Sequence, residues 1–344
     1  MLRTLNMQMY NDKEMINEMN ERIGITLGDA AGIGPELVVK AFQHKGIREK
    51  ATWIVAGDRA VLERAEAITG KHLNVTFIQD IHDAKTKAGT IYFIEMAPLD
   101  AGSYKLGELS PDAGDAAGEC LKYLIRIAKE GFISSIMYAP LNKEALHRGG
   151  HEFKDELHFF ATLFGVTSGF SEINKMDDLW VTRVTSHVSL KEVSDLVTKE
   201  KVAWTIRFAN ETLEKAGYTN PKIAVAALNP HAGDGGMLGQ EEIEVIQPEV
   251  DRAKSEGLNV RGAYPADTLF VRRRKDPFDC LVAMYHDQAQ TGMKLLGFNK
   301  GVTISVGLPV PLTTPAHGTA FDIAGKGEAD EGATIEALKM AVQL

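Results

Sequence analysis

The chain has 344 residues, of which 44% are hydrophobic and 25% are charged, and its formal net charge is -9. This length suits two domains, or one large α/β unit, with ample apolar surface to bury. The composition excludes the disordered and fibrous classes. The acidic balance argues against a nucleic-acid-binding protein, which needs a basic face to meet phosphates.

The first 22 residues and the two cysteines bear on targeting and compartment. Residues 1–22 mix Met with charges of both signs and lack the apolar core of a secretory signal, so we expect an N-terminal extension. Elsewhere about 18 apolar residues never run together, so we expect no membrane span. Cys120 and Cys280 stand in no metal or redox spacing, which predicts reduced core residues of a cytoplasmic protein.

Short β-rich runs alternate with longer helical patterns along the chain. Strands are predicted at 23–27, 52–57, 74–78, 90–95, 134–139, 179–184, 222–228 and 281–285. Helical spacing of apolar residues is found at 36–43, 116–131, 202–217 and 241–257. Several strands are apolar on both faces, as in a parallel sheet covered by helices. The pattern predicts an α/β fold of two interleaved domains within 23–344, with mostly parallel sheets and a cleft between the domains.

Glycine and proline mark the ends of two predicted helices and interrupt a third. Gly131 and Gly217 follow helical patterns, where they are expected to stop the helix at its carboxyl end. Pro248 lies inside the last pattern and predicts a kink or a break, because proline cannot donate the helical hydrogen bond.

The segment at 28–36 reads GDAAGIGPE and connects the first strand to the first helix. Gly34 can cap that helix and Pro35 suits its first position, and the free amides there attract anions. It is a poor match to the Rossmann fingerprint, because the third glycine is missing and Asp58 comes too late for the acidic residue of the second strand. We therefore interpret it as a tight strand-to-helix turn lining the cleft.

Three histidines each follow a predicted strand: His187, His231 and His286. Ligands gather at the carboxyl edge of parallel sheets, and three neutral imidazoles can hold a divalent metal while leaving positions open for substrate. A histidine at such a place can also be purely structural. Asp287 could orient an imidazole or assist proton transfer, or it could cap the helix that follows the strand.

The segment at 316–330, AHGTAFDIAGKGEAD, resembles the H-G-[ST]-A-x-D-I-A-G-K-G loop of isocitrate and isopropylmalate dehydrogenases, which holds the adenosine part of a nicotinamide dinucleotide. Further motifs in the same order are ITLGDAAGIGPEL, NPHAGDGG, YPADTLF and AMYHDQ. With these, the chain from residue 23 onward resembles the 4-hydroxythreonine-4-phosphate dehydrogenase family, whose members are relatives of those enzymes.

The resemblance implies a homodimer with a metal site shared between subunits. Its ligands would be His187 and His231 of one subunit and His286 of the partner subunit, around zinc above all, otherwise Mn, Co, Ni or Mg. The metal would bind a secondary hydroxyl of the substrate, and NAD or NADP would accept a hydride from the carbon that carries it. The β-keto acid formed could then lose carbon dioxide.

The resemblance also assigns roles to single residues. The expected cofactor-binding residues are His317, Gly318, Thr319, Ala320 and Asp322. Lys294 matches a substrate-contacting lysine, and Asp267 and Asp287 match acidic positions suited to proton handling or to contacts with the substrate hydroxyl. Asp267 could instead cap the turn after Pro265.

The substrate positions depart from the family pattern. The family's G-H-T-E segment is replaced by FKDELHFF, which puts Glu156 and Leu157 at the His-Thr position, and the family's Asn and Arg contacts fall on Thr303 and Leu312. A carboxylate at 156 repels a phosphate dianion, and the loss of the arginine removes a bidentate clamp.

The pattern therefore favours a substrate without phosphate, or a phosphate held by other residues. His158 or Lys154 could take that role if the local alignment shifts, and the aspartate that precedes the family's H-G-T is Ala316 here. Glu156, Lys294 and Thr303 are the candidate substrate-binding residues.

Two interpretations of the whole chain follow. The first is a divalent-metal- and NAD(P)-dependent dehydrogenase that oxidises a secondary hydroxyl of a small hydroxy acid or diol. The alternative is a non-catalytic relative that binds metal or metabolite, because the substitutions are concentrated around the substrate.

Overall fold

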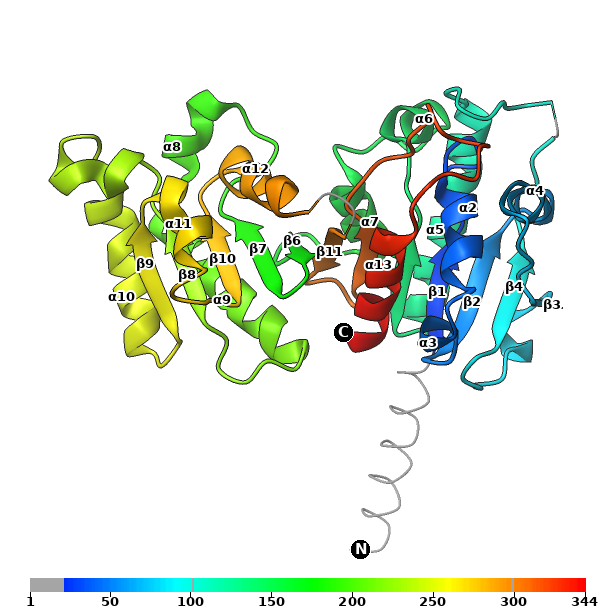
Figure 1. Ribbon diagram of the computed structural model, residues 1–344, viewed down its shortest axis with the longest axis horizontal. Coiled ribbons are helices and arrows are strands. Elements are labelled where there is room, and N and C mark those ends of the chain that lie inside the picture. The colour runs from blue at the N-terminus through cyan, green and yellow to red at the C-terminus, as the bar shows by residue number, and fades with distance from the viewer. Residues whose placement is uncertain (1–21, 101, 298–299) are drawn as a thin grey trace, which may run out of the picture. The chain divides into compact units, whose positions relative to one another are not determined.

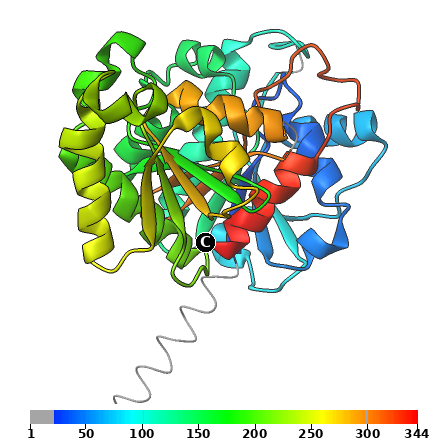
Figure 2. The same cartoon turned by 60° about the vertical axis from the view of Figure 1, so that its left-hand side comes forward.

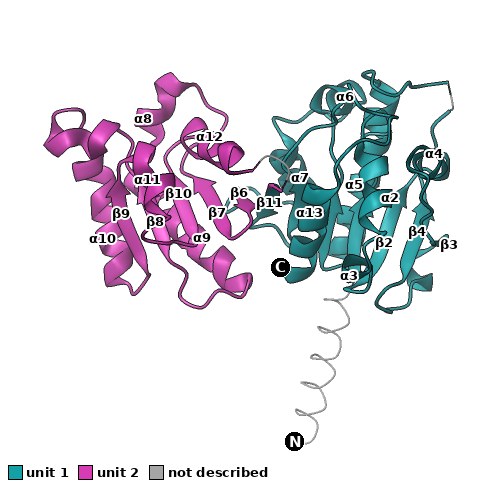
Figure 3. Cartoon of the chain, viewed as in Figure 1, with its two compact units in different colours: residues 1–171, 302–344 teal, residues 172–301 magenta. Residues whose placement is uncertain are grey.

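The computed structural model describes residues 22–100, 102–297 and 300–344, so the expected extension at 1–22 lies outside it except for Arg22. The chain divides into two compact units (Figure 3). Unit 1 comprises Met1–Ser171 and Val302–Leu344, and unit 2 comprises Glu172–Gly301. Unit 1 is thus built from both ends of the chain, and unit 2 from one continuous segment.

Unit 1 has a central sheet in the order β3-β4-β2-β1-β5-β12-β11. Neighbouring strands are parallel except for β11, which runs antiparallel to β12. The strands are β1 Arg22–Thr26, β2 Thr52–Gly57, β3 Thr76–Ile78, β4 Ile91–Glu95, β5 Ser135–Tyr138, β11 Val302–Val306 and β12 Leu312–Pro315. β1, β2 and β5 are almost wholly buried, as expected for a sheet covered on both faces.

The helices of unit 1 cover this sheet (Figures 1 and 2). Its helical elements are α2 Gly34–Ala41, α3 Lys45–Arg48, α4 Arg59–Thr69, η1 Ile81–Asp83, α5 Pro111–Lys129, α6 Lys143–Arg148, α7 Glu156–Phe164 and α13 Gly332–Gln343. α5 is capped by the Ser110 side chain and starts at Pro111, and its inner face buries Leu121 and Leu124 in the core. α13 lies against β12, where the Thr313 hydroxyl donates to the Ala337 carbonyl at 2.9 Å.

Unit 2 has its own strands in the order β6-β7-β10-β8-β9. β7, β10, β8 and β9 are parallel, and β6 is antiparallel to β7. The strands are β6 Ser171–Met176, β7 Leu179–Arg183, β8 Ile223–Ala226, β9 Val260–Tyr264 and β10 Cys280–Ala283. The helical elements are η2 Leu190–Glu192, α8 Val193–Leu196, α9 Lys199–Lys215, η3 Pro230–Gly236, η4 Glu242–Ile246, α10 Gln247–Ser255, α11 Ala266–Arg272 and α12 His286–Leu296.

The predicted α/β class with mostly parallel strands is confirmed, and each predicted strand is present. Gly131 and Gly217 follow α5 and α9 with φ of 82° and 90°, the left-handed conformation expected of helix-ending glycines. The interruption predicted at Pro248 takes the form of one π-helical turn, η4, which leads directly into α10 with the proline in its first turn.

The two cysteines are buried and unpaired, as expected. Burial raises the pKa of the Cys120 thiol to about 12, so it is not a nucleophile. No helix in the described part of the chain combines the length and apolar character that crossing a bilayer needs. The cytoplasmic location stays a prediction.

Candidate functional site

The three predicted histidines follow three neighbouring parallel strands of unit 2. His187 follows β7, His286 follows β10 and His231 follows β8, and these strands lie in the order β7-β10-β8. Because parallel strands end at the same edge of a sheet, all three imidazoles are delivered to one edge. The sequence predicts each strand end, but only the structure shows that the three strands are neighbours.

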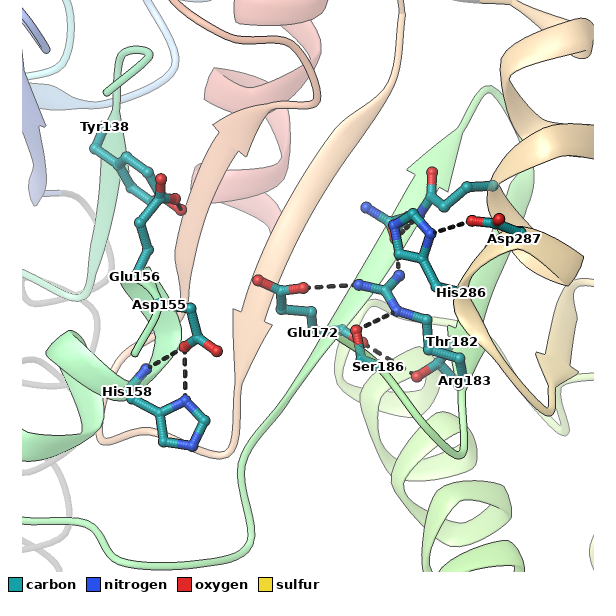
Figure 4. Close-up of polar contacts among 12 residues, drawn as sticks. Tyr138, Asp155, Glu156, His158, Glu172, Thr182, Arg183, Ser186, His286 and Asp287 are labelled. Atoms are coloured by element: carbon teal, nitrogen blue, oxygen red, sulfur yellow. Dashed lines mark hydrogen bonds and ion pairs between the residues drawn. The ribbon is translucent and has the colours of Figure 1, made fainter. Parts of the chain in front are cut away.

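The rings of His187 and His286 lie close together in one chain. Their centroids are 5.7 Å apart and their planes are tilted by 40°. Nδ1 of His286 lies 2.8 Å from Oδ1 of Asp287, a contact drawn in Figure 4. A carboxylate on one ring nitrogen fixes the imidazole and leaves the other nitrogen for a metal.

The helix-capping alternative for Asp287 is wrong. Tyr285 occupies the N-cap position of α12 without a side-chain hydrogen bond, and Asp287 is the second residue of the helix. The side chain of Asp287 is exposed and contacts His286. Its position therefore favours the orienting role.

His231 lies in a loop of unusual backbone conformation. Residues 231–235 all have left-handed φ, between 46° and 78°, although His231, Ala232 and Asp234 are not glycines. The buried carboxylate of Glu242 holds the start of this loop, because it accepts hydrogen bonds from the backbone N–H groups of Leu228 and Asn229, both at 2.8 Å. The conformation of the loop is thus fixed by a specific buried acceptor.

The backbone of the loop at Gly233 lies so close to Glu242 that there is little room for a side chain at that position. A Cβ at Gly233 would lie 2.6 Å from Oε2 of Glu242. Gly233 also has φ of 78°, so a side chain at this position would both crowd Glu242 and strain the backbone.

The three histidines do not complete a three-ligand cluster within one chain. Among the described residues, the group of three potential ligands whose atoms lie within 4.8 Å of one another is Asp115, Glu119 and His151 in unit 1. The His151 ring is buried over Gly118, and its Nε2 lies 3.0 Å from Oδ1 of Asp115. Sequence reasoning missed this group, whose only signal was the four-residue spacing of the two carboxylates on α5.

A pocket of about 690 Å³ lies beside His231 in unit 2. Its walls include His231, Asp267, Tyr285, Gln288 and the apolar Phe270. Asp267 is exposed in the first turn of α11 and makes no capping hydrogen bond, so the capping alternative is wrong for this residue too. Lys294 is exposed farther along α12.

Exposed apolar side chains lie on the same segments of unit 2 as the histidines. Val188 follows His187, Met237 and Leu238 follow the His231 loop, and Leu295 and Leu296 lie near the end of α12. Met237 and Leu295 are 76% and 83% exposed, respectively. We call these five residues the apolar rim. Exposed large apolar side chains on a soluble protein can mark a surface that meets another protein.

The expected cofactor loop packs against the glycine-rich turn within unit 1. Glu36, buried in the first turn of α2, accepts hydrogen bonds from the N–H groups of Gly325 at 2.6 Å and Gly327 at 2.9 Å. Lys40 donates to the carbonyls of Gly327 and Ala329. The segment at 316–330 is therefore fastened to the first helix.

The five expected cofactor-binding residues lie at the start of that loop. Thr319 is buried and its carbonyl accepts a hydrogen bond from Ile33 N at 3.0 Å, beside Gly32. His317 Nδ1 lies 3.0 Å from the Gly318 carbonyl oxygen, Ala320 has φ of 42°, and Asp322 is exposed. Gly318 and Asp322 are thus exposed on the surface of unit 1, and Thr319 holds the start of the loop to Ile33, the residue before α2.

The altered substrate positions of unit 1 are already engaged in contacts. The Tyr138 hydroxyl donates to Oε2 of Glu156 at 3.1 Å. Asp155 caps α7 by accepting from His158 N, and it also lies 2.6 Å from Nδ1 of that histidine (Figure 4). Leu312, at the family's arginine position, is completely buried in β12 and belongs to the core.

A buried arginine in unit 2 was not predicted from the sequence. Arg183, near the end of β7, donates to Oγ of Ser186 at 2.8 Å, to Oδ1 of Asn174 at 2.7 Å and to Oε2 of Glu172 at 2.8 Å. Burial lowers the pKa of the guanidinium from its usual value, and the Glu172 carboxylate opposes that effect. Figure 4 shows the contacts of Arg183 with Glu172 and Ser186.

Comparison with known proteins identifies the family. The profile of the pyridoxal phosphate biosynthetic protein PdxA matches residues 49–341. The chain belongs to this family. It is 43% identical over 323 residues to a D-threonate 4-phosphate dehydrogenase from Cupriavidus necator, covering 94% of this chain and 96% of the relative. The family expected from the motifs is thereby confirmed, and by homology the chain is a dehydrogenase.

Solved structures agree with this assignment. A 4-hydroxythreonine-4-phosphate dehydrogenase from Burkholderia phymatum is 43% identical, with a TM-score of 0.78 and coverage of 94% of this chain and 98% of that one. A terephthalate 1,2-cis-dihydrodiol dehydrogenase from Burkholderia xenovorans is 25% identical, with a TM-score of 0.65 and coverage of 94% and 98%. A β-decarboxylating dehydrogenase from Thermococcus kodakarensis, 16% identical with a TM-score of 0.50 and coverage of 93% and 82%, shares the fold.

Proposed function

We propose that this chain is a divalent-metal- and NAD(P)-dependent dehydrogenase that oxidises the secondary hydroxyl of a hydroxy acid phosphate of the D-threonate 4-phosphate class. The relative of that name is 43% identical over nearly the whole chain, whereas the dihydrodiol dehydrogenase is 25% identical. This comparison narrows the expected substrate from any small hydroxy acid or diol to a phosphorylated hydroxy acid. Of the two alternatives for the altered substrate positions, it favours a phosphorylated substrate whose phosphate is held by residues other than Leu312.

The observation that carries the proposal is the placement of three imidazoles at one sheet edge. Imidazole nitrogens suit zinc, cobalt or nickel better than magnesium, which prefers oxygen ligands. Asp287 beside His286 supplies the carboxylate that commonly orients a metal-binding imidazole. A divalent cation bound there lowers the pKa of the substrate hydroxyl and stabilises negative charge that develops on its oxygen.

We propose that two subunits share the metal site, as the family resemblance implies. Two features support this. The histidines of one chain do not form a complete three-ligand group among the described residues. The apolar rim adjoins the segments that carry them, and a second copy would cover it. The expected division, with His187 and His231 from one subunit and His286 from the partner subunit, is part of this proposal.

The segment at 316–330 is proposed to bind the dinucleotide, with His317, Gly318, Thr319, Ala320 and Asp322 as its contact residues. Support comes from its attachment through Glu36 to the first turn of α2, because a helix N-terminus favours an anionic ligand. The proposal covers either NAD or NADP as the dinucleotide.

The remaining site residues handle protons and substrate charge. In the oxidation, the substrate hydroxyl loses its proton to a carboxylate, for which we propose Asp267 or Asp287, and the carbinol carbon loses a hydride to the nicotinamide. The β-keto acid formed can then break its bond to the carboxylate and release carbon dioxide, and the electron pair left behind is protonated. Lys294 of unit 2 supplies a positive charge for the substrate carboxylate or phosphate. Glu156 and Thr303 of unit 1 stay predicted substrate-binding residues.

The test is an assay of NADH or NADPH formation at 340 nm with D-threonate 4-phosphate and, as the matched control, D-threonate without phosphate. The proposal predicts turnover of the phosphorylated compound that stops when a chelator removes the metal and returns when zinc or cobalt is added. His231→Ala should abolish turnover. Binding of cofactor and metal without any rise in absorbance across a panel of hydroxy acids would instead support a non-catalytic relative.

A further inference from the structure

We propose that Gln288 is a positioning residue that ties together the strand ends from which His231 and His286 emerge. This rests on the proposed metal site. Gln288 is the third residue of α12, and its side chain makes two hydrogen bonds. Its Oε1 accepts from the backbone N–H of Met284 at 2.7 Å, and its Nε2 donates to the carbonyl of Ala227 at 2.8 Å.

The side chain of Gln288 acts at the point where the backbone pairing of two strands stops. The register of β10 with β8 ends at the pair Val282 and Val225. Met284 and Ala227 are the residues two positions farther along, and both are completely buried. Their polar backbone groups therefore have no access to water, and Gln288 bridges them in place of a further ladder bond.

The hydrogen bonds continue to β7, the strand that precedes His187. The carbonyl of Met284 accepts hydrogen bonds from Thr185 N at 3.0 Å and from the Thr185 hydroxyl at 2.8 Å. A chain of hydrogen bonds thus runs from Thr185 through Met284 and Gln288 to Ala227. It crosses the ends of β7, β10 and β8, a few residues before each histidine.

Only an amide side chain can make both bonds of Gln288. Glutamate of the same size keeps the acceptor for Met284 N but places a second acceptor against the Ala227 carbonyl. Alanine removes both. Loss of the bridge frees the His231 segment from the start of α12, so the spacing of the ligands is no longer fixed in advance of metal binding.

The experiment measures zinc affinity by competition with a chromophoric chelator, using Gln288→Glu, Gln288→Ala and the control Gln290→Glu. Gln290 is the control, because it lies on the same helix, is half-buried and donates to the Asn174 side chain of β6 at 2.7 Å rather than to the backbone at the ends of β10 and β8. Both Gln288 variants are expected to bind zinc about 10-fold more weakly, the lower end of the effect of removing a residue that orients metal ligands. The visible spectrum of the cobalt-loaded protein should change in the same variants and stay as in wild type for Gln290→Glu.

A metal-free readout separates this inference from the proposed metal site. Hydrogen–deuterium exchange of the metal-free protein should speed up in peptides covering 228–233 and 284–287 for Gln288→Ala, and not for the control. Unchanged exchange, or zinc affinity within twofold of wild type in both Gln288 variants, would overturn the positioning role. If His231→Ala binds zinc as wild type does, the proposed metal site fails, and the exchange result alone then decides whether Gln288 holds the strand ends.

Discussion

The carboxylate of Glu36 accepts a hydrogen bond from the backbone N–H of Gly325 at 2.6 Å, although the two residues are separated by 289 positions in the chain. The second oxygen of Glu36 accepts from Gly327 at 2.9 Å. Two motifs at opposite ends of the sequence, the glycine-rich turn and the 316–330 loop, are therefore one structural element.

Replacement of Glu36 by Gln should loosen this element. The NH2 group of glutamine would place a donor against one of the two glycine N–H groups. Losing this buried hydrogen bond to a charged acceptor should lower the free energy of unfolding by about 2 kcal/mol. We expect the dissociation constant for NAD(P)H, measured by fluorescence titration, to rise at least about 5-fold, equivalent to roughly 1 kcal/mol. Glu331→Gln, at a more exposed carboxylate paired with His44, serves as the control. Equal affinities in Glu36→Gln and wild type would contradict the anchoring role.

The stability of the protein should depend on pH through Asp29. Burial raises the pKa of this carboxyl from 3.8 to about 6, against the opposing hydrogen bond from Ala31 N. Between these values the folded protein keeps a proton that the unfolded chain has lost, so the free energy of unfolding falls as the pH rises. A shift of this size corresponds to about 3 kcal/mol, present below roughly pH 4 and lost above about pH 6.

The measurement is urea unfolding of wild type and Asp29→Asn at intervals from pH 4 to pH 7. The variant should lack the part of the slope that Asp29 causes, and Asp112→Asn, at an exposed carboxylate, should keep it. Identical slopes in all three proteins would show that the Asp29 carboxyl titrates normally.

The packing of His151 on α5 requires a glycine at position 118. A Cβ there would lie 2.2 Å from Nε2 of the His151 ring, which is almost fully buried. Gly118→Ala should therefore destabilise the protein by about 1–3 kcal/mol through overpacking. Gly46→Ala is the matched control, because nothing lies within 4 Å of a Cβ at that helical position, and it should stabilise by about 0.4–1 kcal/mol. Thermal unfolding compares the two, and equal effects would refute the close approach.

The buried ion pair of Arg183 should matter far more than a surface pair of the same type. Arg183→Met leaves the Glu172 carboxylate, whose side chain is 20% exposed, without its charged partner, and should cost about 3–5 kcal/mol. Arg207→Met removes a similar bond to Glu256 with both side chains 40% exposed, and should cost no more than about 1 kcal/mol. Chemical unfolding measures both. A difference below the experimental error would mean that Arg183 is solvated in solution.

Several parts of the fold were predictable from local patterns, and others were not. The apolar runs of β1, β2 and β10 mark strands buried on both faces, and their ends were predicted within a residue or two. Among the described strands, β6, β9, β11 and β12 escaped prediction. β11 (VTISV) and β12 (LTTP) are short, and β12 ends on a proline. Their place in the sheet depends on packing against distant segments.

The candidate site shows the same division. That His187, His231 and His286 each follow a strand was readable from the sequence, because an apolar run ends before each of them. That β7, β10 and β8 are neighbours depends on crossover connections, which the sequence leaves undetermined. The roles of Gln288 and Arg183 were equally hidden, since their partners are backbone groups or side chains brought near by the fold.

The most direct test of the shared histidine site is anomalous scattering from crystals of the full-length protein grown with zinc. The account predicts one strong peak per subunit, within about 2.0–2.1 Å of imidazole nitrogens from His187, His231 and His286, with both subunits contributing. A peak at Asp115, Glu119 and His151 with none at the three histidines would contradict it.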